Sequence, residues 1–415
     1  MQKLKQAYGN WVVGDQFWRR EEDVALMTQR VDGAANQLLV AVRRMGKTSL
    51  MHELARRLAA RYTCVFLDLQ KAWSGADAVV EMSLGTHEHK PLWERTLNVF
   101  GSMVEALTRT VESLNLNEVG IKLRASMTEG DWARKGDHLF HVLAAAPKPV
   151  LLLMDEVPIL VNRLLKGSDY RITPERRQRT DEFMSWLRDN SQRHQGKVRM
   201  IVTGSIGLEP VLRQAGLSAS LNTFALYDLK PWSEDTAVGC LRALANEYGV
   251  QYRDQAEVHM ARRLGCCIPH HVQTFFQRVH DVCVRRKNME VSSADVEPMY
   301  TSEMLGSRGH AELAHYEERL RMVLGSEILP LALEMLTEAA VTGRLTREAL
   351  IALQKFYQFP ERTVVDAQKE ILGVLEHDGY LRPEDNGFVF VSRLVADWWK
   401  HTHATFHIPV LDRKI

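Results

Sequence analysis

The chain has 415 residues, of which 45% are hydrophobic and 25% are charged, and its formal net charge is +1. This composition is typical of a globular protein with a sizeable core, and the length indicates two or three domains. The balanced charge argues against a protein that coats polyanions over its whole surface, and it leaves local basic patches open.

The cysteine pattern and the absence of long apolar runs suggest a cytoplasmic protein that does not enter a membrane. An odd number of cysteines without metal-ligand spacing fits a reducing compartment. The adjacent Cys266 and Cys267 are interpreted as small buried residues, because a bridge between neighbours is strained.

A loop near the N-terminus carries the strongest chemical signal. It follows a short apolar run at 37–41, which predicts a buried strand, and it precedes residues 49–58, whose apolar side chains recur at helical spacing. Residues 41–48 between them read Ala-Val-Arg-Arg-Met-Gly-Lys-Thr. A strand, a tight loop and a helix with Gly-Lys-Thr at the loop's end predict a phosphate-binding loop, in which Ala41 replaces the usual glycine with another small residue.

The residue types of this loop suit phosphate chemistry. Backbone N–H groups at a helix N-terminus and the helix dipole both favour an anion. Lys47 can reach the β- and γ-phosphates, and the hydroxyl of Thr48 can bind Mg²⁺. The remaining candidates for the nucleotide cradle are Arg44, Met45, Gly46 and Ser49.

A second strand is predicted at 64–69, and about 80 residues separate it from the next apolar strand, more than one crossover needs. Within this insertion, 93–116 and 137–145 have helical periodicity, and 119–125 alternates like a half-exposed strand. We interpret the insertion as a decoration of the sheet edge that offers a surface for partners, with Trp132 as a packing residue.

Two further strands end in polar residues. The run at 149–154 is typical of a central parallel strand and leads into Asp155, a candidate Mg²⁺ ligand, and Glu156, a candidate for polarising the attacking water. The strand predicted at 197–205 ends in Thr-Gly-Ser, so that Thr203 or Ser205 could lie beside the γ-phosphate; simple turn chemistry explains the same residues equally well.

Arginines gather at 171–179, ahead of a helix predicted at 180–194. They fit a solvated face, an arginine finger that reaches a neighbour's γ-phosphate, or a nucleic-acid contact. Arg213 is another candidate finger. The pattern does not choose among these readings.

A fifth strand is predicted at 224–229, and Ser233 is the expected N-cap of the first helix in an all-helical segment that extends to about residue 300. The adjacent His270 and His271 would point to different faces of a helix, which favours packing and solvent contact over metal binding.

The C-terminal part predicts a winged helix. Helices are expected at 328–340, 346–356 and 361–378, followed by a β-hairpin at 379–391 with Asn386-Gly387 in its turn and a closing helix at 392–400. The helix that would read DNA carries more acidic than basic residues, and the wing tip is acidic too. Phosphate contact needs a basic face, so a role in protein interaction or packing is favoured over DNA binding.

Three segments of the sequence resemble a known family. Residues 43–49, residues 131–132 ahead of 151–156, and residues 203–208 look like prokaryotic ATPases of the STAND and archaeal-ATPase group, AAA+-like proteins related to origin-recognition ATPases. The resemblance implies an α/β fold: a P-loop parallel sheet with an additional strand, an all-helical lid and a C-terminal winged helix. The corresponding domains would be 1–230 with an insertion at about 71–147, 231–305, and 306–415.

The resemblance also implies ATP and Mg²⁺ as cofactors, with Thr48 and Asp155 on the metal and with Lys47, Glu156 and a sensor at Ser205 as catalytic residues. In this family an aromatic box ahead of the first strand and a proline of the lid lie near adenine. The matching residues here are Val13, Phe17 and Pro269, and the first two could instead seal the edge of the core.

The expected function is an ATP-binding and hydrolysing molecular switch or motor that couples nucleotide state to homo-oligomer assembly or to control of a partner protein. One alternative is a DNA-binding ATPase that acts in replication, transposition or regulation. Another is a component of an antiviral defence system that works with a separate effector protein.

Overall fold

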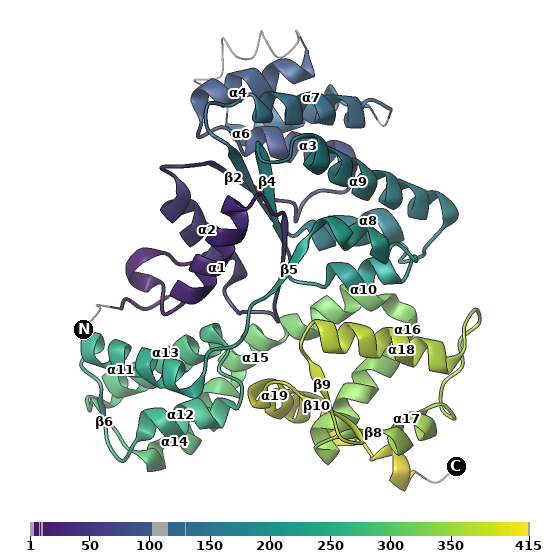
Figure 1. Cartoon of the computed structure of the whole chain (residues 1–415). Helices are drawn as coiled ribbons and strands as arrows, with labels where there is room; N and C mark the ends of the chain where they lie inside the picture. Colours follow the sequence, from purple (N-terminus) through teal and green to yellow (C-terminus); the bar gives the residue numbers. More distant parts are fainter. Residues whose placement is uncertain (1–3, 8, 10, 102–114, 129, 414–415) are drawn as a thin grey trace. The chain divides into compact units, whose positions relative to one another are not determined.

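The computed structural model describes residues 4–7, 9, 11–101, 115–128 and 130–413 (Figure 1). The chain divides into two compact units, each built from separate stretches of sequence. Unit 1 comprises Met1–Arg20, Ala41–Ser49 and Leu229–Ile415, and unit 2 comprises Glu21–Val40 and Leu50–Asp228.

Unit 2 is built around a parallel five-stranded sheet of order β2-β3-β4-β1-β5. Its strands are β1 (Gln37–Val40), β2 (Thr63–Asp68), β3 (Val150–Asp155), β4 (Val198–Thr203) and β5 (Ala225–Asp228). All residues of β3 and β4 are buried, as expected for central strands covered on both faces. Strand β4 lies between β1 and β3, and this is the additional strand that the sequence resemblance implied.

Two helices predicted for this unit, at 49–58 and 180–194, begin earlier than expected, and further helices accompany them. Together they are α1 (Glu21–Asp32), α2 (Lys47–Leu58), α8 (Val157–Lys166), α9 (Pro174–Arg193) and α10 (Leu208–Arg213). Helix α9 begins six residues before the predicted start at 180, because the Thr173 side chain caps it by accepting from the Arg176 N–H and Pro174 occupies the first turn. The arginine-rich segment therefore includes the start of a helix.

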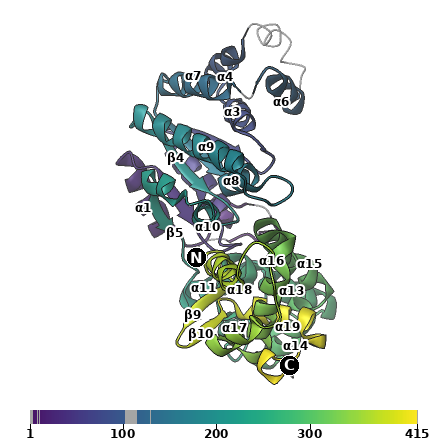
Figure 2. The same ribbon diagram turned by 90° about the vertical axis from the view of Figure 1, so that its right-hand side faces the viewer.

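The insertion is helical, and one sequence prediction for it is wrong. It contains α3 (Gly75–Leu84), α4 (Lys90–Leu97), α6 (Leu116–Ala125) and α7 (Trp132–Ala144), which gather together in both views (Figures 1 and 2). The segment 119–125, expected as a strand, lies inside α6. The helix expected at 93–116 is present as far as Leu97, and residues 102–114 lie outside the described part. As predicted, Trp132 packs on aromatic rings, those of Phe183 and Trp186.

In unit 1 the predicted lid consists of α11 (Glu234–Tyr248), α12 (Ala256–Leu264), α13 (Pro269–Arg286) and α14 (Ser293–Met299). The sequence missed two short strands, β6 (Gln251–Tyr252) and β7 (Glu290–Val291), which pair in parallel between these helices. Two-residue strands carry too little alternation to be recognised.

The predicted cap of α11 is confirmed, since Ser233 Oγ accepts a hydrogen bond of 3.1 Å from the Thr236 N–H. Replacing Ser233 with alanine should lower the free energy of unfolding by about 1 kcal/mol, because an N–H of the first turn loses its acceptor. Urea denaturation measures this change, and Ser233→Asp is the control that should retain most of the stability. Equal midpoints for the alanine variant and the native protein would contradict the prediction.

The C-terminal elements expected of a winged helix are present. They are α15 (Ser307–Leu313), α16 (His315–Thr342), α17 (Arg347–Leu353), α18 (Val364–His377), α19 (Arg393–His403) and an antiparallel sheet of β8 (Leu345–Thr346), β10 (Gly387–Phe390) and β9 (Leu381–Glu384). Helix α16 is interrupted at Gly325, which has φ 72°, so the predicted helix at 328–340 is its second half.

The predicted hairpin turn is shifted by one residue. Gly387 pairs with Glu384, so the turn residues are Asp385 and Asn386 rather than Asn386 and Gly387. Gly387 is needed in the strand instead, because a Cβ there would lie 2.4 Å from the Leu345 carbonyl oxygen.

Across the described residues, no helix combines the length and apolarity needed to cross a membrane.

Candidate functional site

The phosphate loop connects β1, which ends at Val40, to α2, which begins at Lys47. Two of its residues have positive φ, Arg44 at 67° and Gly46 at 88°. Left-handed residues between right-handed ones are typical of turns that gather backbone N–H groups around an anion. Gly46 adopts this conformation without steric cost, whereas Arg44 is strained there.

The Lys47 side chain folds over its own loop. Its Nζ donates to the carbonyl oxygens of Ala41 at 2.9 Å and Val42 at 3.4 Å, and the residue is 9% exposed. The ammonium group thus lies against the first two residues of the loop, and a phosphate bound there would compete with these carbonyl oxygens for it.

Two other predicted cradle residues make structural contacts within unit 1. Ser49 Oγ accepts from the Val12 N–H at 3.0 Å, and the Met45 carbonyl accepts a long bond of 3.4 Å from Arg20 Nη2. Thr48 is half-buried at the start of α2. The loop is therefore attached to the N-terminal segment at two points.

In unit 2, Asp155 is the last residue of β3, and Glu156 follows it. Glu156 has φ 59° and directly precedes α8, and its N–H donates to Asp155 Oδ1 at 3.0 Å. Asp155 is 8% exposed, so its carboxylate is largely removed from water.

The structure distinguishes the two candidate sensor residues by their contacts. The N–H and Oγ of Ser205 both donate to Glu156 Oε2 at 2.9 Å. The hydroxyl of Thr203 instead donates to the Leu39 carbonyl at 2.7 Å and is fully buried between β4 and β1. Ser205 is therefore the one of the pair that contacts the predicted catalytic acid.

Gly204 allows the end of β4 to lie close to Pro158 and Glu156. A Cβ at that position would lie 2.5 Å from Pro158 Cδ and 3.3 Å from Glu156 Oε2. A larger residue would push the end of β4 away from the start of α8, so the Thr-Gly-Ser sequence serves close packing as well as turn chemistry.

The residues predicted near adenine lie in unit 1. Phe17 is 6% exposed, Val13 is partly buried, and Pro269 is the buried first residue of α13. The next residue, His270, donates its N–H to the Arg44 carbonyl through a long bond of 3.4 Å. The start of α13 thus contacts the phosphate loop.

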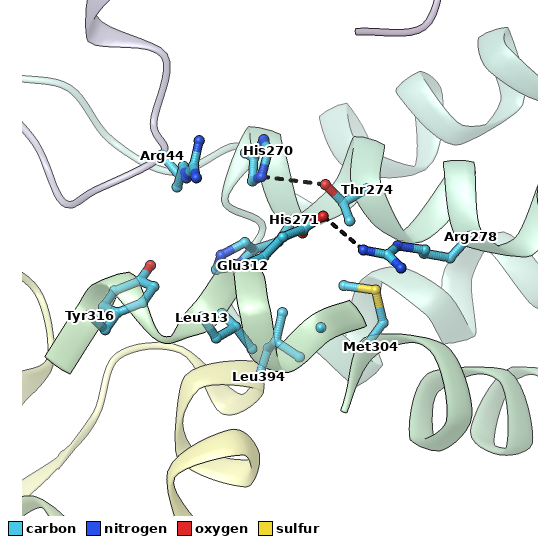
Figure 3. A pocket seen from close by; sticks show the side chains of 11 residues that line it. Arg44, His270, His271, Thr274, Arg278, Met304, Glu312, Leu313, Tyr316 and Leu394 are labelled. Carbon is cyan, nitrogen blue, oxygen red and sulfur yellow. Dashed lines mark hydrogen bonds and ion pairs between the residues drawn. The ribbon is translucent and has the colours of Figure 1, made fainter. Parts of the chain in front are cut away.

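Figure 3 shows a narrow cavity beside this contact. It is lined mainly by residues of α13 and of the C-terminal helices, with Arg44 at one end. Its volume is about 10 Å³, room for about one water molecule, so it is a packing gap and not a nucleotide pocket. Burial, followed by the charge of Arg44, lowers the pKa of His270 to about 3, and both His270 and the fully buried His271 are neutral at pH 7.

Several arginines considered as fingers hold local structure. Arg176 pairs with Asp169 and donates to the Lys166 carbonyl at 2.9 Å, and Arg177 donates to the Ala215 carbonyl at 2.9 Å. Arg213 pairs with Glu209 on the same helix. These contacts support a structural role for these side chains, and a finger among them stays a hypothesis.

Solved structures with the same architecture exist. The Walker-type ATPase of Pyrococcus abyssi is 16% identical over 94% of this chain and 98% of its own, with a TM-score of 0.61. The ORC2 protein of Aeropyrum pernix, solved in ADPNP–ADP complexes, is 12% identical over 95% of both chains, with a TM-score of 0.55. The chain shares the fold of these ATPases.

This similarity confirms, for the fold, the resemblance to AAA+ P-loop ATPases related to origin-recognition ATPases. No protein-family model matches the sequence, and no curated protein matches it. In the part of the chain that is described, no three or more His, Cys, Asp and Glu side chains come together as a metal site.

Proposed function

We propose that the protein binds ATP with Mg²⁺ and hydrolyses it as a molecular switch or motor, whose nucleotide state controls assembly with further copies or with a partner protein. The observation that carries this proposal is the phosphate loop between β1 and α2, with positive φ at Arg44 and Gly46 and with Lys47 folded onto its carbonyls. The ADPNP and ADP in the ORC2 structure support an adenine nucleotide as the ligand.

The candidate metal ligands fit Mg²⁺. This ion prefers oxygen donors, and the hydroxyl of Thr48 and the carboxylate of Asp155 are of that kind. When bound, Mg²⁺ would offset the charge of the phosphates. Lys47 would hold the β- and γ-phosphates, and Glu156 would orient the attacking water and accept its proton.

Ser205 would set the position of Glu156. Its two hydrogen bonds to Glu156 Oε2 would hold that carboxylate in the position from which it orients water. The division into a core (1–230), a lid (231–305) and a winged-helix domain (306–415) belongs to the same proposal, with Val13, Phe17 and Pro269 near adenine.

Replacing Ser205 with alanine should lower ATP turnover by roughly tenfold, because a hydrogen bond to a charged group contributes about 1.5 kcal/mol or more. The backbone N–H still holds Glu156, so ATP affinity should stay within about twofold. Phosphate release under saturating ATP measures the first quantity and calorimetric titration the second. Ser205→Thr is the matched variant that keeps the hydroxyl, and a turnover as low as that of the alanine variant would count against this role.

A protein partner is favoured over DNA by the charges of the C-terminal elements. On α18 and just before it, Arg362 pairs with Glu370 at 2.6 Å, and Lys369 lies 3.9 Å from Asp366. In the hairpin, Arg382 pairs with Glu384 at 2.7 Å. Basic side chains that are already matched by carboxylates offer little to a phosphate backbone.

One experiment tests the proposed function against its DNA-binding alternative. ATP hydrolysis and molecular mass are measured together, with and without duplex DNA at low salt. We expect measurable hydrolysis, a mass that increases with ATP, and no response to DNA. Stimulation by DNA would support the DNA-binding ATPase instead, and failure to bind ATP at all would mean that the fold serves as a scaffold.

A further inference from the structure

Consecutive residues of the phosphate loop are each contacted by a different part of unit 1. Val42 is approached by Gly379, which follows α18 and has φ 74°. A Cβ built on Gly379 would lie 1.8 Å from Val42 Cγ1, so this approach requires glycine both for its conformation and for its size.

The next residue, Arg43, donates from Nη1 to the His315 carbonyl at 3.0 Å, at the first residue of α16. The segments that contact Val42 and Arg43 are themselves joined. Tyr380 Oη donates to the Tyr316 carbonyl at 2.7 Å, and the two rings meet edge to face at 5.5 Å. Both tyrosines are buried, so the two contacts form one rigid support.

The third residue, Arg44, accepts from the His270 N–H at the start of α13. The φ of Arg44 is positive, a conformation that glycine adopts without strain and arginine does not. Strained backbone of this kind persists where its surroundings fix it. The contacts on Val42, Arg43 and Arg44 are the surroundings that fix this turn.

Charge at this place favours an anion. Burial lowers the pKa of Arg43, and the nearby positive charges of Arg319 on α16 and of Arg44 lower it further. A phosphate bound in the loop would supply negative charge where these guanidinium groups repel one another.

We propose that the contacts made by Gly379, His315 and His270 preorganise the phosphate loop for its anion, and that a bound nucleotide in turn strengthens the attachment of the C-terminal elements to the loop. The inference rests on the proposed function and adds to it a regulatory coupling. The contacts strengthen nucleotide binding, and the nucleotide strengthens the contacts. Both effects express the same coupling free energy, so they must have the same size.

The test compares two glycine substitutions. Gly379→Ala introduces a Cβ against Val42, whereas Gly343→Ala places the same residue at a φ of 84° with nothing within 4 Å. Both variants carry backbone strain, and only the first disturbs the loop. We expect Gly379→Ala to weaken ADP and ATP binding by roughly tenfold and Gly343→Ala to change it by less than about twofold.

A second variant and a second readout separate this effect from general misfolding. Arg43→Ala should weaken binding by about fivefold, the effect of one lost hydrogen bond, and Arg43→Lys should recover part of it. Hydrogen exchange gives the reverse direction: ADP should slow exchange at the backbone amides of 379–381 and 315–318 in the native protein, and less so in Arg43→Ala.

The outcomes are distinguishable. If neither the native protein nor any variant binds nucleotide, the proposed function fails and this inference fails with it. If the native protein binds and Gly379→Ala and Arg43→Ala bind equally well, the proposed function stands and the preorganisation is wrong. Tighter binding by these variants would mean that the contacts hold the loop back, which also overturns the inference.

Discussion

Replacing Lys47 with alanine is expected to weaken ATP binding by roughly 30- to 1,000-fold, equivalent to about 2 to 4 kcal/mol. The ammonium group lies within hydrogen-bonding distance of the Ala41 and Val42 carbonyls, and in the proposed function it holds the β- and γ-phosphates. Its loss leaves backbone N–H groups and the start of α2 to hold the anion, and these are weaker because they carry only partial charge.

Calorimetric titration with ATP and Mg²⁺ measures the effect. Lys355→Ala serves as the matched control, because it removes the same charge from an exposed position beside α17. Thermal unfolding without nucleotide should be similar for the two variants. Equal ATP affinity of Lys47→Ala and the control would exclude this loop as the phosphate site.

Replacing Glu156 with glutamine is expected to reduce turnover by about 10²- to 10⁴-fold while ATP affinity stays nearly unchanged. Glutamine has almost the same shape and can still accept from the N–H and Oγ of Ser205, but it cannot take a proton from water. The variant should therefore retain ATP and accumulate whatever assembly ATP favours.

Single-turnover phosphate release and light scattering on the same samples check both parts of this prediction. Glu361→Gln, an exposed position before α18, is the control for the loss of one negative charge. Hydrolysis by Glu156→Gln at the native rate would assign the base to another residue. Normal affinity with slow turnover and an unchanged mass would retain the enzyme and reject the assembly switch.

The sequence predicted the central parts of the fold because their signals are local. Each predicted strand of the sheet overlaps a strand in the structure, since a short apolar run bounded by polar residues identifies a buried strand. Asp155 and Glu156 are proposed as site residues because they stand at the end of such a run, and Lys47 and Thr48 because their spacing suits a phosphate site.

The wrong prediction at 119–125 shows where periodicity fails. Val119 and Leu123 are buried and Ile121 is 65% exposed, a pattern that fits a helix with residues four apart on one face. The overlooked signal was Asn115, whose side chain caps α6 by accepting from the Glu118 N–H at 3.0 Å. An asparagine three residues before a glutamate indicates a helix start, and it outweighs a short alternation.

Contacts between distant residues could not be predicted at all. Nothing in the neighbourhood of Gly379 indicates that its missing side chain makes room for Val42, and nothing near His315 indicates that its carbonyl receives Arg43. Likewise Ser205 is recognisable as a strand-end residue, but its bond to Glu156 depends on which strands are neighbours. The pattern of apolar and polar residues identifies helices and strands. Which residues far apart in the sequence come into contact depends on how the whole chain packs.

The discontinuous composition of unit 1 has a consequence for biosynthesis. The phosphate loop leaves the ribosome early, whereas its supports at His315 and Gly379 come near the end of the chain. At about 5 to 20 residues per second, roughly 15 to 65 s pass between the two. If the proposed coupling holds, a nascent copy without these supports would bind ATP more weakly than one in which they have folded.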